Sequence, residues 1–169
     1  DALLAKLTQQ PGVIPLALHV DYWDYIGWKD KFAHPGFTDR QRAYAKAEGA
    51  KMIYTPQMII GGVDRVVGHE PAVVAQAIMR QAAKAKPVHL TVEKQGDVLS
   101  IRLQADPPLT SGSFVQLVRY MPVSEVEIEA GENAGHKIEY RNIVTSWQKI
   151  GDWAGQAPAE MVASAPGKV

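Results

Sequence analysis

A nearly continuous apolar run from Val13 to Val20 constrains the fold more than any other stretch of the sequence. Such runs are typical of strands that are buried on both faces, as in a parallel sheet. Polar Asp21 marks the carboxyl end of the predicted strand. Residues 22–37 then form a predicted loop rich in aromatic side chains, and loops of this length are more often functional than idle.

Predicted helices lie on both sides of this strand in the sequence. Residues 1–9 have the apolar spacing of an amphipathic helix. Thr38 and Gln41 have the spacing of a capping box, so we expect the second helix to start at Thr38. Gly49 suits the residue that follows the end of this helix, where a left-handed backbone is common.

A hairpin is predicted directly after Thr55-Pro56. Gln57 to Ile60 forms its first strand, Gly61-Gly62 its turn, and Val63 to Val67 its return strand. Pro71 suits the first turn of a further helix. Residues 1–86 therefore alternate helix and strand, as an α/β domain does.

From Val88 onward the apolar residues recur with the period of two that is typical of β-strands. The predicted strands are residues 89–94, 98–103, 114–121, 123–130 and 137–145, with a turn at Gly131–Gly135. Residues 88–169 are therefore predicted to form a mainly antiparallel, β-rich C-terminal domain. The chain opens inside its first helix without an initiator Met, so we expect it to be an internal piece of a longer protein whose C-terminal domain is truncated here.

Composition excludes several classes of function. The 169 residues carry no net charge, which argues against binding to nucleic acid or to an anionic membrane surface. Apolar runs fall short of the roughly 20 residues that a membrane helix needs, and no signal peptide is visible. The chain has no Cys, so it contains neither a disulfide nor a thiol nucleophile.

The order of predicted elements becomes βαβαββα, the thioredoxin-like order, if one strand is placed before Asp1. In that fold the proline that opens the later strand is cis, so we predict a cis Thr55–Pro56 bond close to the first helix and to the Asp21–Trp23 segment. The alternative is an ordinary proline at the start of a strand, where its missing N–H is tolerated.

Four stretches carry a resemblance to a known family. They are His19-Val-Asp-Tyr-Trp-Asp24, Gly27-Trp-Lys-Asp30, Phe37-Thr-Asp-Arg-Gln-Arg42 and Tyr54-Thr-Pro-Gln-Met58. They resemble a family of secreted, thioredoxin-like proteins of bacteria and plants that is catalogued as a domain of unknown function. In that family a first strand and a Cys-x-x-Cys followed by Pro-Pro-Ala precede the residue that matches Asp1, and these are absent here.

The resemblance implies a surface on which Asp21, Trp23 and Pro56 face a redox dithiol. A thiolate at a helix N-terminus is stabilised by the helix dipole, and the helix near Asp1 would supply that position. Asp21 could relay protons during exchange, or it could serve with Asp24 as a capping or ion-pairing residue. Thr55 belongs to the same expected site.

Aromatic side chains form the expected substrate-binding part of this surface. The candidates are Trp23, Trp28 and Tyr54. Their alternative role is packing within the core or the loop. His19, Asp21 and His34 are the candidate metal ligands, but their spacing matches no standard site. A buried His19 with satisfied hydrogen bonds is the favoured interpretation, and no metal or cofactor is expected.

Two classes of function remain open. The first is a secreted or periplasmic thiol–disulfide oxidoreductase that acts on a protein or peptide thiol when the molecule is intact. The second is a non-catalytic thioredoxin-fold module that holds a partner protein or peptide. The sequence before Asp1 distinguishes them, because only the first requires a Cys-x-x-Cys there. The sequence does not fix the oligomeric state.

Overall fold

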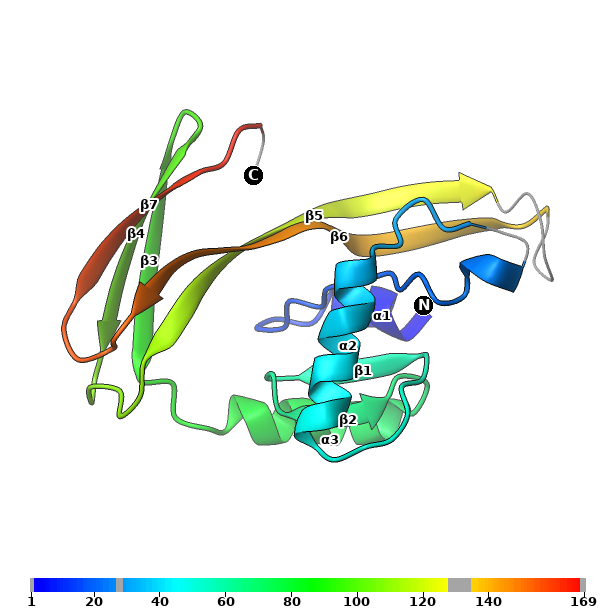
Figure 1. Ribbon diagram of the computed structural model, residues 1–169, viewed down its shortest axis with the longest axis horizontal. Helices are drawn as coiled ribbons and strands as arrows, with labels where there is room; N and C mark the ends of the chain where they lie inside the picture. Colours follow the sequence, from blue (N-terminus) through cyan, green and yellow to red (C-terminus); the bar gives the residue numbers. More distant parts are fainter. Residues whose placement is uncertain (1, 27–28, 128–134, 168–169) are drawn as a thin grey trace. The chain divides into compact units, whose positions relative to one another are not determined.

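The structure is a computed structural model that describes residues 2–26, 29–127 and 135–167. The chain forms two compact units, the first comprising Asp1–Ala83 with Arg119–Thr145 and the second Lys84–Val118 with Ser146–Val169. The sequence predicted one boundary at residue 87. The difference arises because two long strands, β5 (Ser113–Glu127) and β6 (Lys137–Trp153), contribute to both units (Figure 1).

The first unit combines helices with a short hairpin. Its elements are α1 (Ala2–Leu7), the 3-10 helix η1 (Asp24–Ile26), α2 (Pro35–Ala47), β1 (Gln57–Ile60), β2 (Asp64–Val67) and α3 (Pro71–Ala82). Strands β1 and β2 pair antiparallel, as predicted. The turn between them contains Gly61 and Gly62, whose positive φ values of 62° and 72° explain why glycine occupies both positions.

Helices α1 and α3 and the hairpin share one hydrophobic core. Its buried residues are Leu7, Val66, Val74 and Ala77, and the partly buried residues packed against them are Leu3, Val13, Met58, Ile60 and Ile78. Val73 of α3 is 38% exposed and lies outside this core. Burial of one apolar stripe from each helix is what holds such short helices in place.

The Val13–Val20 segment differs from its prediction as a strand buried on both faces. It is extended, and within the described residues it forms a single parallel bridge, between Ala17 and Ile143 of β6. Most of its residues are half-buried, and Ile14 is 77% exposed. Pro15 contributes to this outcome because it has no N–H to donate to a ladder.

Helix α2 begins earlier than the sequence predicted. It starts at Pro35 rather than Thr38, with His34 as the N-cap whose Nδ1 accepts a hydrogen bond from the Gly36 N–H at 3.0 Å. Proline is favoured at the first helical position, and this signal outweighed the capping-box pattern. The predicted end is confirmed, because Gly49 has φ 70° directly after the Glu48 C-cap.

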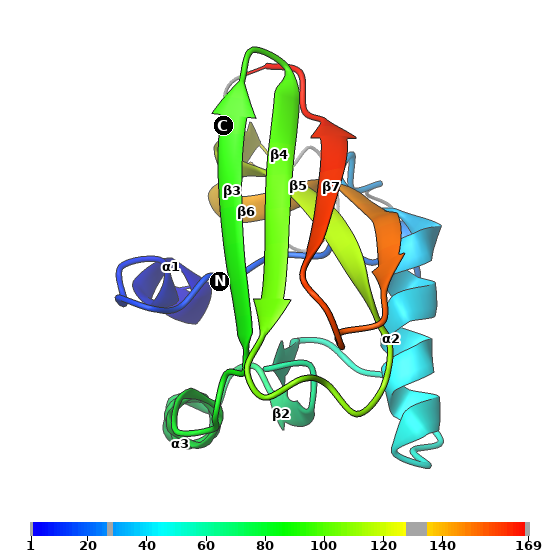
Figure 2. The same ribbon diagram turned by 90° about the vertical axis from the view of Figure 1, so that its left-hand side faces the viewer.

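The second unit contains a three-stranded antiparallel sheet in the order β3–β4–β7 (Figure 2). Strands β3 (Val88–Gln95) and β4 (Val98–Ala105) form the predicted hairpin, and β7 (Ala159–Ser164) is a strand that the sequence analysis missed. One face of the sheet covers a core of buried residues, namely Leu99, Ile101, Leu103, Trp153, Ala163 and Ala165.

Strands β5 and β6 are longer than predicted and form a two-stranded sheet. The sequence predicted a break at Pro122, but β5 continues through it. A strand with only one neighbour tolerates proline, because its N–H can face away from that neighbour. Residues 131–134 of the predicted turn lie outside the described residues.

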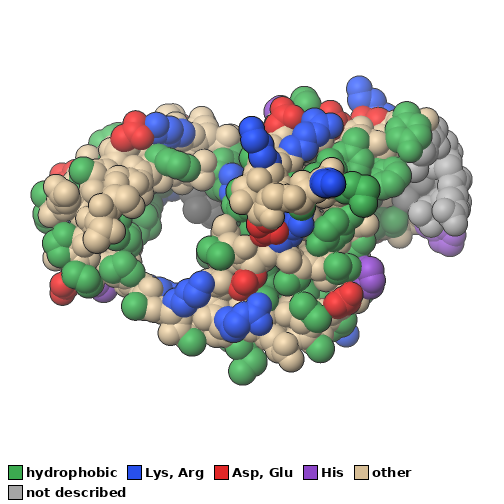
Figure 3. Space-filling model, turned by 60° about the horizontal axis from the view of Figure 1, so that its bottom comes forward, with side chains coloured by type: hydrophobic (Ala, Val, Ile, Leu, Met, Phe, Trp, Pro, Cys, Tyr) green, Lys and Arg blue, Asp and Glu red, His purple; other side chains and the backbone are tan. Residues whose placement is uncertain are grey.

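The surface is mixed in charge. Figure 3 shows basic and acidic side chains interspersed with exposed hydrophobic ones, in keeping with a net charge of zero. Among the helices that the structure describes, none has both the length and the apolar character needed to cross a membrane.

Candidate functional site

Three consecutive residues, Asp21, Tyr22 and Trp23, reach three different partners in the first unit. They follow the extended Val13–Val20 segment directly and precede η1. Their partners lie on helix α2 and in the Tyr54–Pro56 loop before β1. The segment therefore links α2 to that loop, and we call the resulting region the 21–23 surface.

Asp21 is held by the first part of α2. Its Oδ1 accepts a hydrogen bond from the Thr38 hydroxyl at 2.5 Å, while its backbone N–H donates to Thr38 Oγ1 at 3.3 Å. Thr38 is only 1% exposed, so this hydroxyl is removed from water. A buried hydroxyl is costly without a partner, which explains why a threonine inside the helix points at Asp21.

Gln41 connects the same segment to the loop before β1. Its Oε1 accepts from the Tyr22 hydroxyl at 3.1 Å, and its Nε2 donates to the Tyr54 carbonyl at 2.7 Å. The spacing of Thr38 and Gln41 predicted a helix cap. The structure instead uses both side chains for contacts with distant segments, because the helix already has its cap at His34.

Trp23 is hydrogen-bonded to Thr55, the residue before Pro56. Its indole N–H donates to Thr55 Oγ1 at 2.9 Å, and the Thr55–Pro56 bond is cis, so the cis bond and its contact with the Asp21–Trp23 segment are confirmed, while its closeness to the start of the first helix stays a prediction. The Gly68 N–H donates to the Pro56 carbonyl at 2.9 Å. A Cβ on Gly68 would lie 3.1 Å from the Pro56 Cβ, so only glycine fits this close approach without movement.

Exposed aromatic rings flank this bond. Trp23 is 43% exposed and Tyr25 is 79% exposed, and their rings stack with centroids 6.5 Å apart. The Tyr22 ring is tilted against the Trp23 ring, with centroids 5.5 Å apart. Trp28, the third predicted aromatic of this surface, lies outside the described residues. Aromatic rings with both an exposed face and a polar partner are suited to contact with a polypeptide.

The ring of Tyr54 packs against the cationic side chain of Arg65. The Arg65 guanidinium lies 5.7 Å from its ring centroid, and Arg65 also forms an ion pair with Glu48 at 2.9 Å. Tyr54 therefore belongs to the support of the loop, through its ring and through its carbonyl bond to Gln41. Its expected role in binding a substrate stays a prediction.

A partly buried contact joins His19, just before the 21–23 surface in the chain, to Asp30, just after it. His19 Nδ1 contacts Asp30 Oδ2, and the side chains are 11% and 16% exposed. Burial raises the pKa of Asp30, but hydrogen bonds from His19 and the Phe32 N–H outweigh it and leave that pKa below its usual value. Burial, followed by the charge of Asp30, raises the pKa of the Tyr140 phenol.

The surroundings of His19 fit a structural role. Its ring packs edge-on against Tyr140 at 4.8 Å and against Phe32 at 5.6 Å. This agrees with the favoured interpretation of a buried, hydrogen-bonded histidine, although spacing in the sequence gave no sign that Asp30 is its partner. In the residues that the structure describes, no three acidic, histidine or cysteine side chains gather as metal ligands.

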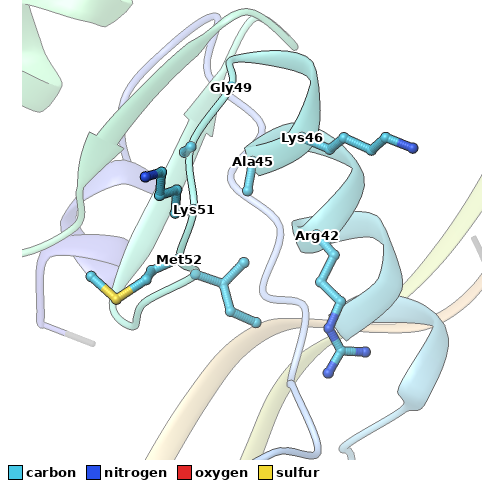
Figure 4. A pocket seen from close by; sticks show the side chains of 8 residues that line it. Arg42, Ala45, Lys46, Gly49, Lys51 and Met52 are labelled. Carbon is cyan, nitrogen blue, oxygen red and sulfur yellow. The ribbon is translucent and has the colours of Figure 1, made fainter.

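A groove of about 450 Å³ lies between the end of α2 and the segment that follows it (Figure 4). Arg42 and Lys46 of the helix and Lys51 and Met52 of the segment line it. Figure 4 shows Lys46 and Lys51 extending in different directions, and Arg42 is paired with Asp39 at 3.0 Å. Because these charges do not converge on one point, the groove is not assigned a ligand.

A protein family and a solved structure are similar to this chain over nearly its whole length. A family model described as "Protein of unknown function (DUF1223)" matches residues 1–169. A crystal structure of an Agrobacterium tumefaciens protein, determined as a structural-genomics target, is similar with a TM-score of 0.82 and 28% sequence identity. That similarity covers 98% of this chain and 70% of the other. No curated protein matches the chain.

Proposed function

The chain belongs to the DUF1223 family of proteins of unknown function, and we propose that the intact protein is a thioredoxin-like thiol–disulfide oxidoreductase. The bond between the Trp23 indole and Thr55 Oγ1 carries the proposal. It unites the end of the extended segment with the loop at Pro56. In the thioredoxin-like arrangement these two places flank the redox dithiol.

The order of elements supports the same arrangement. Helix α1, α2, the β1–β2 hairpin and α3 follow one another in the order of βαβαββα after its first strand, with the extended Val13–Val20 segment, which makes one isolated bridge, in the place of the second strand. In the described part of the chain, β1 pairs only with β2, and the Val13–Val20 segment has only its bridge to β6. Both could therefore pair with a strand that precedes Asp1 in the intact protein.

The proposed reaction is exchange between a dithiol and a disulfide. One thiolate of a Cys-x-x-Cys preceding Asp1 attacks a substrate disulfide and forms a mixed disulfide, and the departing substrate sulfur takes up a proton. The second thiolate then attacks the mixed disulfide and releases the other substrate thiol. Two electrons and two protons pass to the substrate, and a small-molecule dithiol re-reduces the protein.

The described residues have three roles in this proposal. The Asp21 carboxylate, oriented by Thr38, accepts or returns the proton of the second thiol. Trp23 and Tyr25 present stacked, exposed rings to the polypeptide substrate. Thr55 fixes the Trp23 ring against the loop at Pro56. We place the protein in the periplasm or outside the cell, because the family that it resembles is secreted.

The experiment is the reduction of a disulfide-bridged peptide by the intact natural protein with dithiothreitol as reductant. Catalysis above the rate of dithiothreitol alone is expected, with a lower kcat/KM for Trp23→Ala. Tyr120→Ala is the matched control, because Tyr120 is an equally exposed aromatic residue (43%) on β5. A rate equal to that of dithiothreitol alone would overturn the proposal.

A second candidate function is a binding module without turnover. It is favoured by the exposed Trp23–Tyr25 stack together with the absence of Cys from all 169 residues. In this case the intact protein binds an unfolded polypeptide but accelerates no thiol exchange. Binding that is weakened by Trp23→Ala, in a protein with no reactive thiol, would select this function over the first.

A further inference from the structure

Strand β3 lies at one edge of the second unit's sheet and carries an exposed apolar strip (Figure 2). Val88, Leu90 and Val92 are 39%, 54% and 48% exposed. Their cross-strand neighbours on β4 include Leu103 and Ile101, which are buried in the core of the unit. Directly paired residues share a face of the sheet, so the apolar face that forms this core continues onto β3 without cover.

The outer edge of β3 also presents unpaired backbone groups. The Asp106 N–H donates to the Pro87 carbonyl at 2.8 Å, so residues 87 and 106 form a hydrogen-bonded pair. Hydrogen-bonded and non-hydrogen-bonded pairs alternate along an antiparallel ladder, so every second residue after Pro87 faces β4. The residues whose N–H and C=O groups face outward are therefore Val88, Leu90, Val92 and Lys94.

The residues that usually prevent an edge strand from pairing with another chain lie only at the two ends of β3. Proteins protect edge strands with proline, with lysine or with bulges. Pro87 precedes β3, and Lys94 near its end is turned to the Gly167 carbonyl. The six residues from Val88 to Glu93 contain neither proline nor lysine, and they pair with β4 without a bulge. In the described part of the chain β3 has no second neighbouring strand.

We propose that β3 pairs antiparallel with β3 of a second copy of this chain, with the two-fold axis at Thr91. This register sets Leu90 opposite Val92 of the second copy. Both residues have outward backbone groups, so they exchange two hydrogen bonds as an antiparallel ladder requires. The same pairing covers Leu90 and Val92, because they pack side by side across the new boundary.

The opposite face of the strand is complementary in the same register. His89 stands opposite Glu93 of the second copy, and the two Thr91 side chains meet at the axis. Threonine pairs are among the favourable cross-strand contacts, and a His89 ring nitrogen can donate a hydrogen bond to the Glu93 carboxylate, which also pairs with Arg102 of its own chain at 3.0 Å. Moving the axis to Val92 sets Leu90 opposite Lys94, whereas moving it to Leu90 brings Pro87 opposite Glu93. Of these three registers, the axis at Thr91 pairs Leu90 with Val92 and His89 with Glu93, while Val88 lies opposite Lys94, and the interface is isologous.

Light scattering coupled to size-exclusion chromatography, on the intact protein over a range of concentrations, tests the pairing. The mass is expected to rise toward twice that of the chain. Val92→Pro is expected to hold the protein at the monomer mass, because it removes an outward N–H and no bond to β4. Circular dichroism checks that this variant is folded.

Val162→Pro on β7 is the matched control. The Ala165 N–H donates to the Asp97 carbonyl at 2.7 Å, so the alternation along β7 turns the N–H of Val162 outward as well. Val162 is 72% exposed and lies on the other edge of the same sheet. This variant should dimerise like the wild type, and equal loss of dimer in both proline variants would overturn the assignment to β3.

Substitutions at His89 test the register without proline. His89→Glu places two like charges opposite one another on each side of the axis and should raise the dissociation constant several-fold. His89→Lys should lower it several-fold, with an effect that shrinks at high salt. A monomer at every concentration, or a dissociation constant unchanged by both substitutions, would overturn the proposal even if Val92→Pro fails to fold.

Discussion

The indole N–H of Trp23 donates a hydrogen bond to Thr55 Oγ1 at 2.9 Å across 32 residues of sequence. This bond joins the segment that ends the apolar run to the loop before β1. Together with the contacts of Asp21 to Thr38 and of Tyr22 to Gln41, it fixes three successive side chains. The position of the 21–23 surface is therefore set by polar contacts rather than by a ladder of strands.

Thr55→Val should weaken this link without changing the volume of the side chain. We expect the free energy of unfolding to fall by about 0.5–1 kcal/mol, within the usual range for a hydrogen bond, because Trp23 is 43% exposed. Urea unfolding measures the change, and Thr55→Ser, which keeps the hydroxyl, is the control. Thr55→Val and Trp23→Phe are also combined in a double variant. If its loss of unfolding free energy equals the sum of the two single losses, the bond does not couple the two residues.

Thr38→Val should cost more, because it leaves the Asp21 carboxylate without its hydroxyl donor in a buried place. The expected loss is about 1–3 kcal/mol of unfolding free energy. Thr38→Ser keeps the donor and should retain most of the stability. Equal losses for the valine and serine variants would mean that packing of the threonine methyl, and not the bond to Asp21, stabilises this contact.

The pair of His19 and Asp30 predicts a dependence of stability on pH. The pKa of Asp30 is lowered in the folded protein, so its contribution is present above the unfolded pKa of about 3.9 and is lost as the pH falls through the folded value. Asp30→Asn should therefore destabilise the protein at pH 7, and the difference from the wild type should shrink below about pH 4.

Unfolding in urea at a series of pH values measures this dependence. Asp39→Asn is the control, because Asp39 is 73% exposed in its pair with Arg42 and surface pairs contribute little. A stability difference between Asp30→Asn and the wild type that stays constant from pH 7 down to pH 3 would contradict the account of the pair.

Gly68→Ala tests the close approach to Pro56. The added Cβ would lie 3.1 Å from the Pro56 Cβ, so the loop or β2 must move, at an expected cost of about 1–3 kcal/mol. Gly112→Ala is the matched control, since its Cβ would meet its nearest neighbour at an ordinary 3.9 Å. Thermal unfolding of both variants measures the difference, and equal midpoints would show that the approach at Gly68 can relax without cost.

Local signals in the sequence predicted the elements that depend on local chemistry. The hairpin around Gly61-Gly62, the end of α2 at Gly49 and the helix that begins at Pro71 all follow from backbone preferences of the residues concerned. These preferences act within a few residues, so one sequence is enough to reveal them.

Contacts between distant segments could not be predicted in the same way. Thr38 and Gln41 fitted a capping box, but their partners Asp21, Tyr22 and Tyr54 are 13 to 19 residues away. The apolar run from Val13 to Val20 indicated a strand buried on both faces, but strand pairing depends on neighbours that periodicity does not specify. Likewise β5 continues through Pro122, because a two-stranded sheet leaves one side of each strand free.

The thiol count of the protein isolated from its natural source tests the central claim most directly. Its intact mass is measured after reduction and alkylation, and again after alkylation without reduction. The proposed oxidoreductase predicts two alkylated cysteines after reduction, both mapping to a Cys-x-x-Cys before Asp1, and none in the oxidised protein. If the reduced protein gains no mass on alkylation, it has no reactive thiol, and this result would contradict the proposed activity.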